Sequence, residues 1–277
     1  MKVSDAVQRR VSIRAFKPEV PPAAVVRTLL ERAARAPSGG NLQPWHVHAL
    51  AGEPLAQLLR LVASEPWQDQ PEYAVYPPDL WEPYRTRRFR NAEQLYVTIN
   101  IPREDKEARL RQMAKNATFF GAPVGIFLSV DRRMEPPQWA DLGIYLQTVM
   151  LLAVEQGLDT CAQEYWAFRS QPVARFLGLP AERMLFAGIA LGWRDDSAPI
   201  NALRTERDPF EVWGEMLLRD FAEAYLPWAT TQHRLIKVAG LEAELGIAPD
   251  PVRRLAALTL TGSGLAIAET LKLSNAE

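Results

Sequence analysis

The stretch QWADLGIYLQTVMLLAVEQG (residues 138–157) and the two apolar segments after it decide the fold. Residues 138–157 are apolar around most of a helical circumference, which predicts a buried helix, and Gly157 is a suitable residue to end it. Residues 160–163 predict a short strand, and MLFAGIAL (184–191) predicts a long buried strand. A buried helix beside buried strands is typical of a domain built in layers around one sheet.

The remaining core elements are predicted on both sides of this stretch. Two Pro residues followed by apolar side chains at helical spacing predict a helix over 21–36, and alternation predicts a strand over 45–50. The apolar run 124–130 predicts another buried strand. Further helices are predicted over about 54–63, 104–118 and 171–177. Because helices and strands alternate without regular βαβ units, we expect an α+β fold whose central mixed or antiparallel sheet is covered by helices.

An insertion and a C-terminal extension interrupt this pattern. Residues 64–103 contain six prolines with Trp and Tyr residues between them. Proline breaks regular structure, so we expect an irregular, lid-like insertion with one or two short helices near 80–96. We predict a core domain over 1–210 and a helical extension over 211–277, in which residues 212–225 form an apolar face. The extension either wraps a partner subunit, or is a small appended domain or a partly disordered tail.

The composition excludes several classes of protein. With 48% hydrophobic and 23% charged residues among 277, the chain has ordinary globular usage, unlike a disordered, collagen-like or rod-shaped protein. Its net charge of −1 gives no general attraction to nucleic acid or to anionic membranes. The N-terminus has no apolar signal region, and the apolar run 119–130 is too short to span a membrane. The one cysteine, Cys161, is expected to be a buried thiol and fits a cytoplasmic protein with no nucleic-acid or membrane partner.

Three polar segments are candidates for binding a small molecule. In an extended segment Arg10, Ser12 and Arg14 point to one side, and two guanidinium groups with a hydroxyl suit a phosphate. The small residues of PSGGNLQPW (37–45) allow the backbone to approach a ligand, and its side-chain amides suit the edge of a heterocycle. GLDTCAQEYW (157–166) directly follows the buried helix. Taken singly, the first two segments favour a solvated basic stretch and a turn without a ligand, and the third is compatible with a loop between core elements.

The two histidines of the strand over 45–50 form a weaker candidate. His46 and His48 share one face of that strand, and two imidazoles so spaced can bind a metal. The third histidine, His233, is far along the chain. We therefore favour a half-exposed strand face and predict no metal site.

The run YRTRRFR (84–90) is the densest basic segment. A nucleic-acid site would use its Arg side chains for phosphates and its aromatic side chains for stacking. We favour a solvated helix within the insertion. In a third interpretation the insertion is a lid, in which Arg side chains and Tyr84 or Phe89 meet an aromatic carboxylate substrate.

Taken together, five segments resemble the nitroreductase family of FMN-dependent oxidoreductases, and within it the branch that acts on nitrobenzoate-like aromatics. The resemblance covers about residues 5–210, and it rests on the order and spacing of the segments. They are RRVSIRAF (9–16), APSGGNLQPWHV (36–47), FFGAPVGIF (119–127), DLGIYLQTVMLLAVEQGLDTCAQE (141–164) and AGIALGW (187–193).

The resemblance implies a homodimer with two FMN sites at the subunit interface. One subunit is expected to hold the FMN phosphate and ribityl chain, to place a backbone N–H at flavin N5, and to contact the ring, through Arg10, Val11, Ser12, Arg14, Asn116, Gln163, Glu164 and Tyr165. The partner subunit is expected to reach the flavin through Pro37, Ser38, Gly39, Asn41 and Gln43. A basic residue past the last core strand closes on the phosphate, and both Arg204 and Arg207 stand in the right window.

The resemblance also implies the reaction. NADH or NADPH reduces the flavin and leaves, and a nitroaromatic or quinone-like acceptor then takes two electrons in the same pocket, which is a ping-pong mechanism. The flavin carries the chemistry, so no catalytic side chain is expected. The alternatives are a family sibling that reduces enones or removes halogens reductively, and a protein that binds FMN without turnover.

Overall fold

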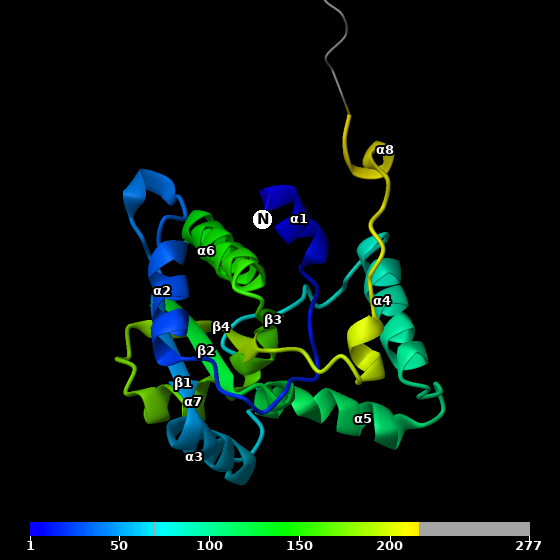
Figure 1. Cartoon of the computed structure of the whole chain (residues 1–277), viewed down its shortest axis with the longest axis horizontal. Coiled ribbons are helices and arrows are strands. Elements are labelled where there is room, and N and C mark those ends of the chain that lie inside the picture. Colours follow the sequence, from blue (N-terminus) through cyan, green and yellow to red (C-terminus); the bar gives the residue numbers. More distant parts are fainter. Residues whose placement is uncertain (69, 216–277) are drawn as a thin grey trace, which may run out of the picture. The chain divides into compact units, whose positions relative to one another are not determined.

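A computed structural model describes residues 1–68 and 70–215, and it divides the chain into two units after Thr205. In the first unit, the described residues form one four-stranded sheet in the order β1-β2-β4-β3 (Figure 1). Every neighbouring pair of strands is antiparallel. The strands are β1 (His46–Ala51), β2 (Val124–Asp131), β3 (Asp159–Gln163) and β4 (Arg183–Gly192). The sheet confirms the predicted α+β class, in its antiparallel form.

Helices cover both faces of this sheet. On one face, α2 (Ala23–Ala33) and α6 (Pro136–Glu155) pack on alternate side chains of β2 and β4, among them Ile126 and Ile189. On the other face, α3 (Gly52–Ser64), α7 (Ser170–Leu177) and two 3-10 turns, η2 (Lys115–Gly121) and η3 (Glu164–Arg169), pack around Phe127. Because both faces are covered, β2 and β4 are apolar along nearly their whole length.

The other helices lie outside these layers. In the first unit they are α1 (Val3–Arg9), η1 (Gly39–Asn41), α4 (Tyr84–Thr98), α5 (Lys106–Ala114) and η4 (Pro199–Ala202). Figure 1 shows α4 and α5 extending away from the sheet. The described part of the second unit, residues 206–215, contains α8 (Phe210–Trp213). In the described ranges no helix combines the length and apolar character needed to cross a bilayer.

Most of the predicted elements are present, with four differences. The helix predicted over 21–36 is confined to α2, because Pro22 caps its start and the chain turns after Ala33. The insertion holds one long helix, α4, because no Pro or Gly follows Pro83 until the helix ends. The helix α1 was not predicted. Most of the extension 211–277, with its apolar face over 212–225, lies outside the described residues, so its role stays a prediction.

The fourth difference lies where a helix was predicted over 104–118. The helix α5 ends at Ala114, and η2 follows it with two left-handed residues, Phe119 (φ 50°) and Phe120 (φ 57°). Both phenylalanines are buried, and the Phe119 ring lies against Phe127 and Trp166. Burial of two aromatic side chains offsets a backbone conformation that costs about 1–3 kcal/mol per residue.

Candidate active site

The N-terminal segment 10–14 lies in extended conformation against β3. Ser12 forms a parallel bridge with Thr160, and the backbone N–H of Ile13 donates to Thr160 O at 3.0 Å. The Ile13 side chain is completely buried. An inward residue 13 leaves residues 12 and 14 on the opposite side of the segment, as the alternation predicts.

Positive charge gathers at the start of β3, around Cys161. Burial raises the pKa of the Cys161 thiol, whereas the charges of Arg14 and Arg10 and a hydrogen bond with Ser12 act to lower it. The Nη1 atom of Arg14 also donates to Ser12 O at 3.1 Å. Arg14 and Ser12 therefore lie close to Cys161, and the charge of Arg10 acts on the same thiol; Cys161 is the buried thiol that was expected.

Asn201, which the sequence did not single out, fixes the end of this segment. Its Oδ1 accepts the backbone N–H of Arg14 at 2.8 Å, and its Nδ2 donates to Ala15 O at 2.8 Å and to Asp195 O at 2.9 Å. One amide side chain thus joins the N-terminal segment to the loop after β4. No local sequence signal identifies it, because its partner Arg14 is 187 residues away.

Replacement of Asn201 tests this joint. Asn201→Ala leaves several backbone groups without a partner, so we expect the free energy of unfolding to fall by about 1–3 kcal/mol. We also expect weaker FMN binding, because the backbone of Arg14 loses its anchor. Urea denaturation and FMN titration measure the two effects. Asn91→Ala, at an exposed position of α4, is the matched control, and equal behaviour of the two variants would contradict the proposed joint.

An ion pair holds the same loop to the sheet. The Nε atom of Arg194 lies 2.8 Å from Asp159 Oδ2, and its Nη2 atom contacts Oδ1. The hydrogen bond with Asp159 raises the pKa of the Arg194 guanidinium. Phe16 bridges to Arg194 in antiparallel fashion, so segment 10–17 is tied to the core at both of its ends. This pair was also not predicted, since its members are 35 residues apart.

The turn between α2 and β1 is bonded to α6 on one side and exposed to solvent on the other. The Gly39 N–H donates to both carboxylate oxygens of Asp141, at 3.2 Å each, and Ser38 Oγ accepts the Gln43 N–H at 3.0 Å. Asp141 is buried in α6, whereas Leu42 at the tip of the turn is 54% exposed. Left-handed backbone occurs at Gly40 (φ 58°), Asn41 (φ 56°) and Gln43 (φ 49°). The predicted partner-facing residues of this turn therefore point away from their own subunit's core.

The segment 163–165 is brought beside Asn116, as the prediction requires. The Gln163 side chain is buried and donates to Asn116 O at 2.9 Å and to Asn116 Oδ1 at 3.1 Å, while its Oε1 accepts Trp166 Nε1–H at 3.4 Å. The Gln163 side chain thus bonds to Asn116, the residue predicted to make a polar contact with the flavin ring. Glu164 and Tyr165 directly follow Gln163. Partial burial raises the pKa of the Glu164 carboxyl and of the Tyr165 phenol.

The remaining candidates lie in three other places. Arg204 donates from Nη2 to Gln8 O, close to Arg10 in the chain, whereas Arg207 is in the second unit and donates to Glu206 O at 2.8 Å. Tyr84 and Phe89 are half-exposed on α4 and contact other residues of the insertion.

The two histidines of β1 lie apart from these segments. Burial and the charge of Arg183 lower the pKa of both His46 and His48. His46 lines a groove of about 650 Å³ between α2 and β1, to which none of the predicted flavin contacts contributes. In the described ranges no three His, Cys, Asp or Glu side chains stand where they could hold a metal ion.

The residues beside β3 fit the phosphate of a nucleotide cofactor. Arg10 and Arg14 supply charge and Ser12 a hydroxyl, and the Thr160 hydroxyl in the same bridge is buried with no hydrogen-bond partner among the described residues. Guanidinium and hydroxyl donors around one point are what a phosphate requires.

The chain belongs to the nitroreductase family. The model of that family matches residues 7–193, which include every strand of the sheet, segment 10–14, the turn 38–43 and segment 163–165.

Three related proteins show how similar this chain is to known proteins and how much of each chain the similarity covers. The chain is 34% identical to the nitrobenzene nitroreductase of Ectopseudomonas oleovorans, over 76% of this chain and 94% of that protein. It is 36% identical to the 4-nitrobenzoate reductase of Pseudomonas putida, over 73% and 89%. Among solved structures, the FMN and NADPH-dependent nitroreductase NfnB from Sphigopyxis sp. strain HMH superposes with a TM-score of 0.75 at 42% identity, over 78% of this chain and 99% of that one.

Proposed function

We propose that this chain is an FMN-dependent oxidoreductase that uses NADPH or NADH to reduce nitroaromatic compounds. The observation that carries the proposal is the convergence of Arg10, Ser12 and Arg14 on β3, next to segment 163–165, in a member of the nitroreductase family. Two relatives are named for nitroaromatic substrates, and one is named as FMN and NADPH-dependent.

When bound, FMN would supply the two-electron redox chemistry that links the nicotinamide donor to the acceptor in a ping-pong sequence. The protein supplies binding and orientation. Arg10, Ser12 and Arg14 bind the phosphate and ribityl chain with the backbone of Val11, and Arg204 or Arg207 closes on the phosphate. Backbone N–H groups of residues 163–165 donate to the isoalloxazine edge, and Asn116 holds this segment in place through Gln163.

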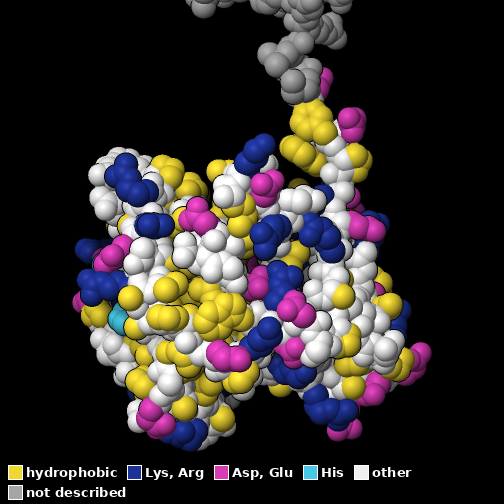
Figure 2. Space-filling model, viewed as in Figure 1, with side chains coloured by type: hydrophobic (Ala, Val, Ile, Leu, Met, Phe, Trp, Pro, Cys, Tyr) yellow, Lys and Arg dark blue, Asp and Glu magenta, His cyan; other side chains and the backbone are white. Residues whose placement is uncertain are grey.

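We further propose a homodimer in which each subunit completes the other's site. Such a dimer would cover apolar side chains that are exposed on α1 and α5. They are Val3 (75%), Val7 (52%), Leu110 (58%) and Met113 (53%), and Leu42 in the turn after α2 is exposed as well. Figure 2 shows exposed apolar side chains on one face, with Lys and Arg as well as Asp and Glu side chains around them. In this dimer Pro37, Ser38, Gly39, Asn41 and Gln43 reach the flavin of the partner.

The acceptor site is proposed to include the insertion 64–103 as its lid. Tyr84 and Phe89 present half-exposed rings on α4, with several Arg side chains on the same helix. An aromatic carboxylate could bind both groups. The buried single cysteine fits a cytoplasmic enzyme, because a reducing compartment keeps thiols free.

Two measurements on the purified protein test the proposal. We expect a yellow protein that releases FMN on denaturation and oxidises NADPH in the presence of 4-nitrobenzoate or nitrobenzene. A colourless protein that fails to bind added FMN would contradict the FMN dependence on which the whole proposal rests. A yellow protein that reduces an enone or a halogenated phenol, but no nitroaromatic, would replace the substrate with that of a family sibling. Bound FMN without turnover of any acceptor would favour a non-catalytic flavin protein.

A further inference from the structure

Four aromatic side chains form a cluster that includes Tyr165 of segment 163–165. The ring of Trp67 stacks on Phe168 at a centroid distance of 5.5 Å and an interplanar angle of 24°, and it lies 5.7 Å from the ring of Tyr165. Tyr165 in turn meets Trp166 edge-on at 5.5 Å. Trp67 is the outermost of the four, with 55% of its surface exposed. The cluster therefore presents an open indole next to the backbone that we assign to the flavin ring.

The backbone before Trp67 is held by a buried guanidinium. Arg169 is 3% exposed, and it donates to Pro66 O at 2.7 Å, to Glu65 O at 3.0 Å and to Val62 O. It thereby satisfies carbonyl groups at the end of α3, which otherwise lack partners within the helix. The Arg169 guanidinium also lies 5.7 Å from the Trp67 ring centroid, within cation–π range.

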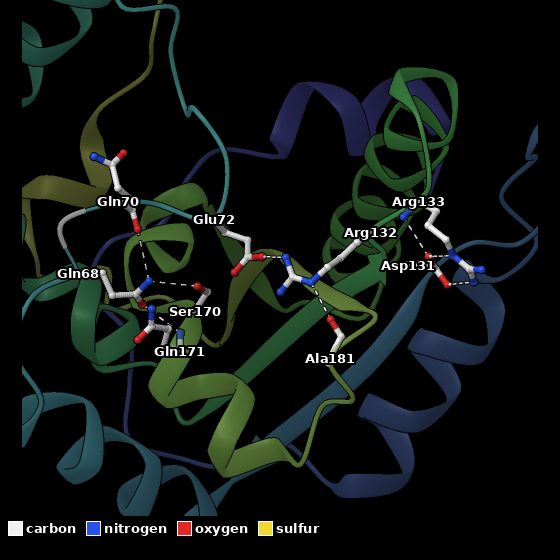
Figure 3. A network of polar contacts seen from close by, with 9 residues as sticks. All are labelled: Gln68, Gln70, Glu72, Asp131, Arg132, Arg133, Ser170, Gln171 and Ala181. Atoms are coloured by element: carbon white, nitrogen blue, oxygen red, sulfur yellow. Dashed lines mark hydrogen bonds and ion pairs between the residues drawn. The ribbon is translucent and has the colours of Figure 1, made fainter.

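The backbone after Trp67 is held by side-chain amides and an ion pair. The Gln68 Nε2 donates to Ser170 Oγ at 3.2 Å, and its Oε1 accepts the Gln171 N–H at 2.9 Å (Figure 3). Further on, the Glu72 N–H donates to Ala167 O at 2.8 Å, and the Glu72 carboxylate pairs with Arg132. The backbone on both sides of Trp67 is thus bonded to η3, which begins within segment 163–165, and to α7, which follows η3.

An exposed but anchored indole is well suited to binding a flat ligand. A side chain that is already held in place loses little conformational entropy when a ligand binds. Stacking on an electron-rich indole favours planar, electron-poor rings, and ring stacking contributes about 0.5–1.5 kcal/mol beyond the burial of area. A nitro-substituted benzene ring has this character.

We propose that Trp67 is the aromatic wall of the acceptor site, and that it selects planar, electron-poor aromatic acceptors by stacking on their ring. Arg169 and Gln68 are positioning residues for this indole. The inference rests on the proposed function, and it adds a residue and a selection rule that the sequence did not supply.

The test compares Trp67→Leu and Trp67→Phe in the FMN-bound enzyme. In Trp67→Leu we expect the Kd of nitrobenzene for the oxidised enzyme, followed by the flavin absorbance without NADPH, to rise about tenfold. The kcat/KM for nitrobenzene falls by the same factor. Turnover with ferricyanide, which accepts electrons without stacking, stays unchanged. Trp67→Phe keeps a ring and recovers most of the loss. Trp213→Leu, which removes an exposed indole outside the insertion, is the control.

The outcomes separate this inference from the proposed function. If the unmodified enzyme binds FMN and reduces nitrobenzene, but Trp67→Leu matches it in Kd and in kcat/KM, the aromatic wall is wrong and the proposed function stands. An equal loss with nitrobenzene and ferricyanide would mean that Trp67 only supports the fold, which also overturns the inference. If the unmodified enzyme neither binds FMN nor turns over, the proposed function itself fails.

Discussion

Arg14→Ala is expected to weaken FMN binding by about 10- to 100-fold. A hydrogen bond to a charged group contributes about 1.5–3 kcal/mol, and each 1.4 kcal/mol is a factor of ten in Kd. Arg14 lies beside Ser12 and Cys161, where its charge acts on the thiol, and its backbone is anchored by Asn201. The Kd is measured by quenching of FMN fluorescence as the apoprotein is added.

The effect should belong to this site and to its geometry. Arg27→Ala removes an exposed guanidinium that pairs with Glu31 on α2, so it should leave the Kd unchanged. Arg14→Lys keeps the charge but loses the planar fork that matches a phosphate, so an intermediate Kd is expected. If Arg14→Ala binds FMN as tightly as the unmodified protein, the phosphate lies elsewhere and the assignment of segment 10–14 fails.

The apolar runs predict the layers of the fold because burial on both faces leaves a clear pattern. β2, β4 and α6 were predicted within about two residues of their bounds. The left-handed pair Phe119 and Phe120 was not predicted, since an apolar sequence does not reveal that its backbone reverses to bury two rings. The helix α1 was missed because its exposed side chains carry little periodic signal.

The sequence predicted the segments that form the candidate site, but not the long-range hydrogen bonds that hold these segments in place. Arg10, Ser12 and Arg14 are brought together, and segment 163–165 lies beside Asn116, as the resemblance implies. The supports of these segments are polar side chains whose partners are far along the chain. Asp141 holds Gly39 across 102 residues and Asn201 holds Arg14 across 187, and no local pattern encodes either contact.

Gly188→Ala is expected to lower the free energy of unfolding by about 1–3 kcal/mol, which is the usual cost of adding a methyl group to a full core. Gly188 lies in β4 between Phe127 of β2 and Gln163 of β3. A Cβ atom there would stand 2.2 Å from Trp166 Cδ1 and 3.1 Å from Phe119 Cε1. Trp166 is fully buried, so its ring has no free space to move into. Urea denaturation of the apoprotein measures the loss.

The clash also reaches the candidate site, because Trp166 Nε1–H bonds to Gln163 and Tyr165 precedes the displaced ring. We therefore expect Gly188→Ala to weaken FMN binding as well as folding. Trp166→Phe supplies the decisive comparison, since the smaller ring leaves room for the added methyl group. In a double-mutant cycle, the combined variant should lose less stability than the two single losses added, by about 0.5–3 kcal/mol. Strictly additive losses would show that the methyl group added at position 188 and the Trp166 ring do not compete for space. In that case the explanation that Gly188 makes room for the Trp166 ring would be wrong.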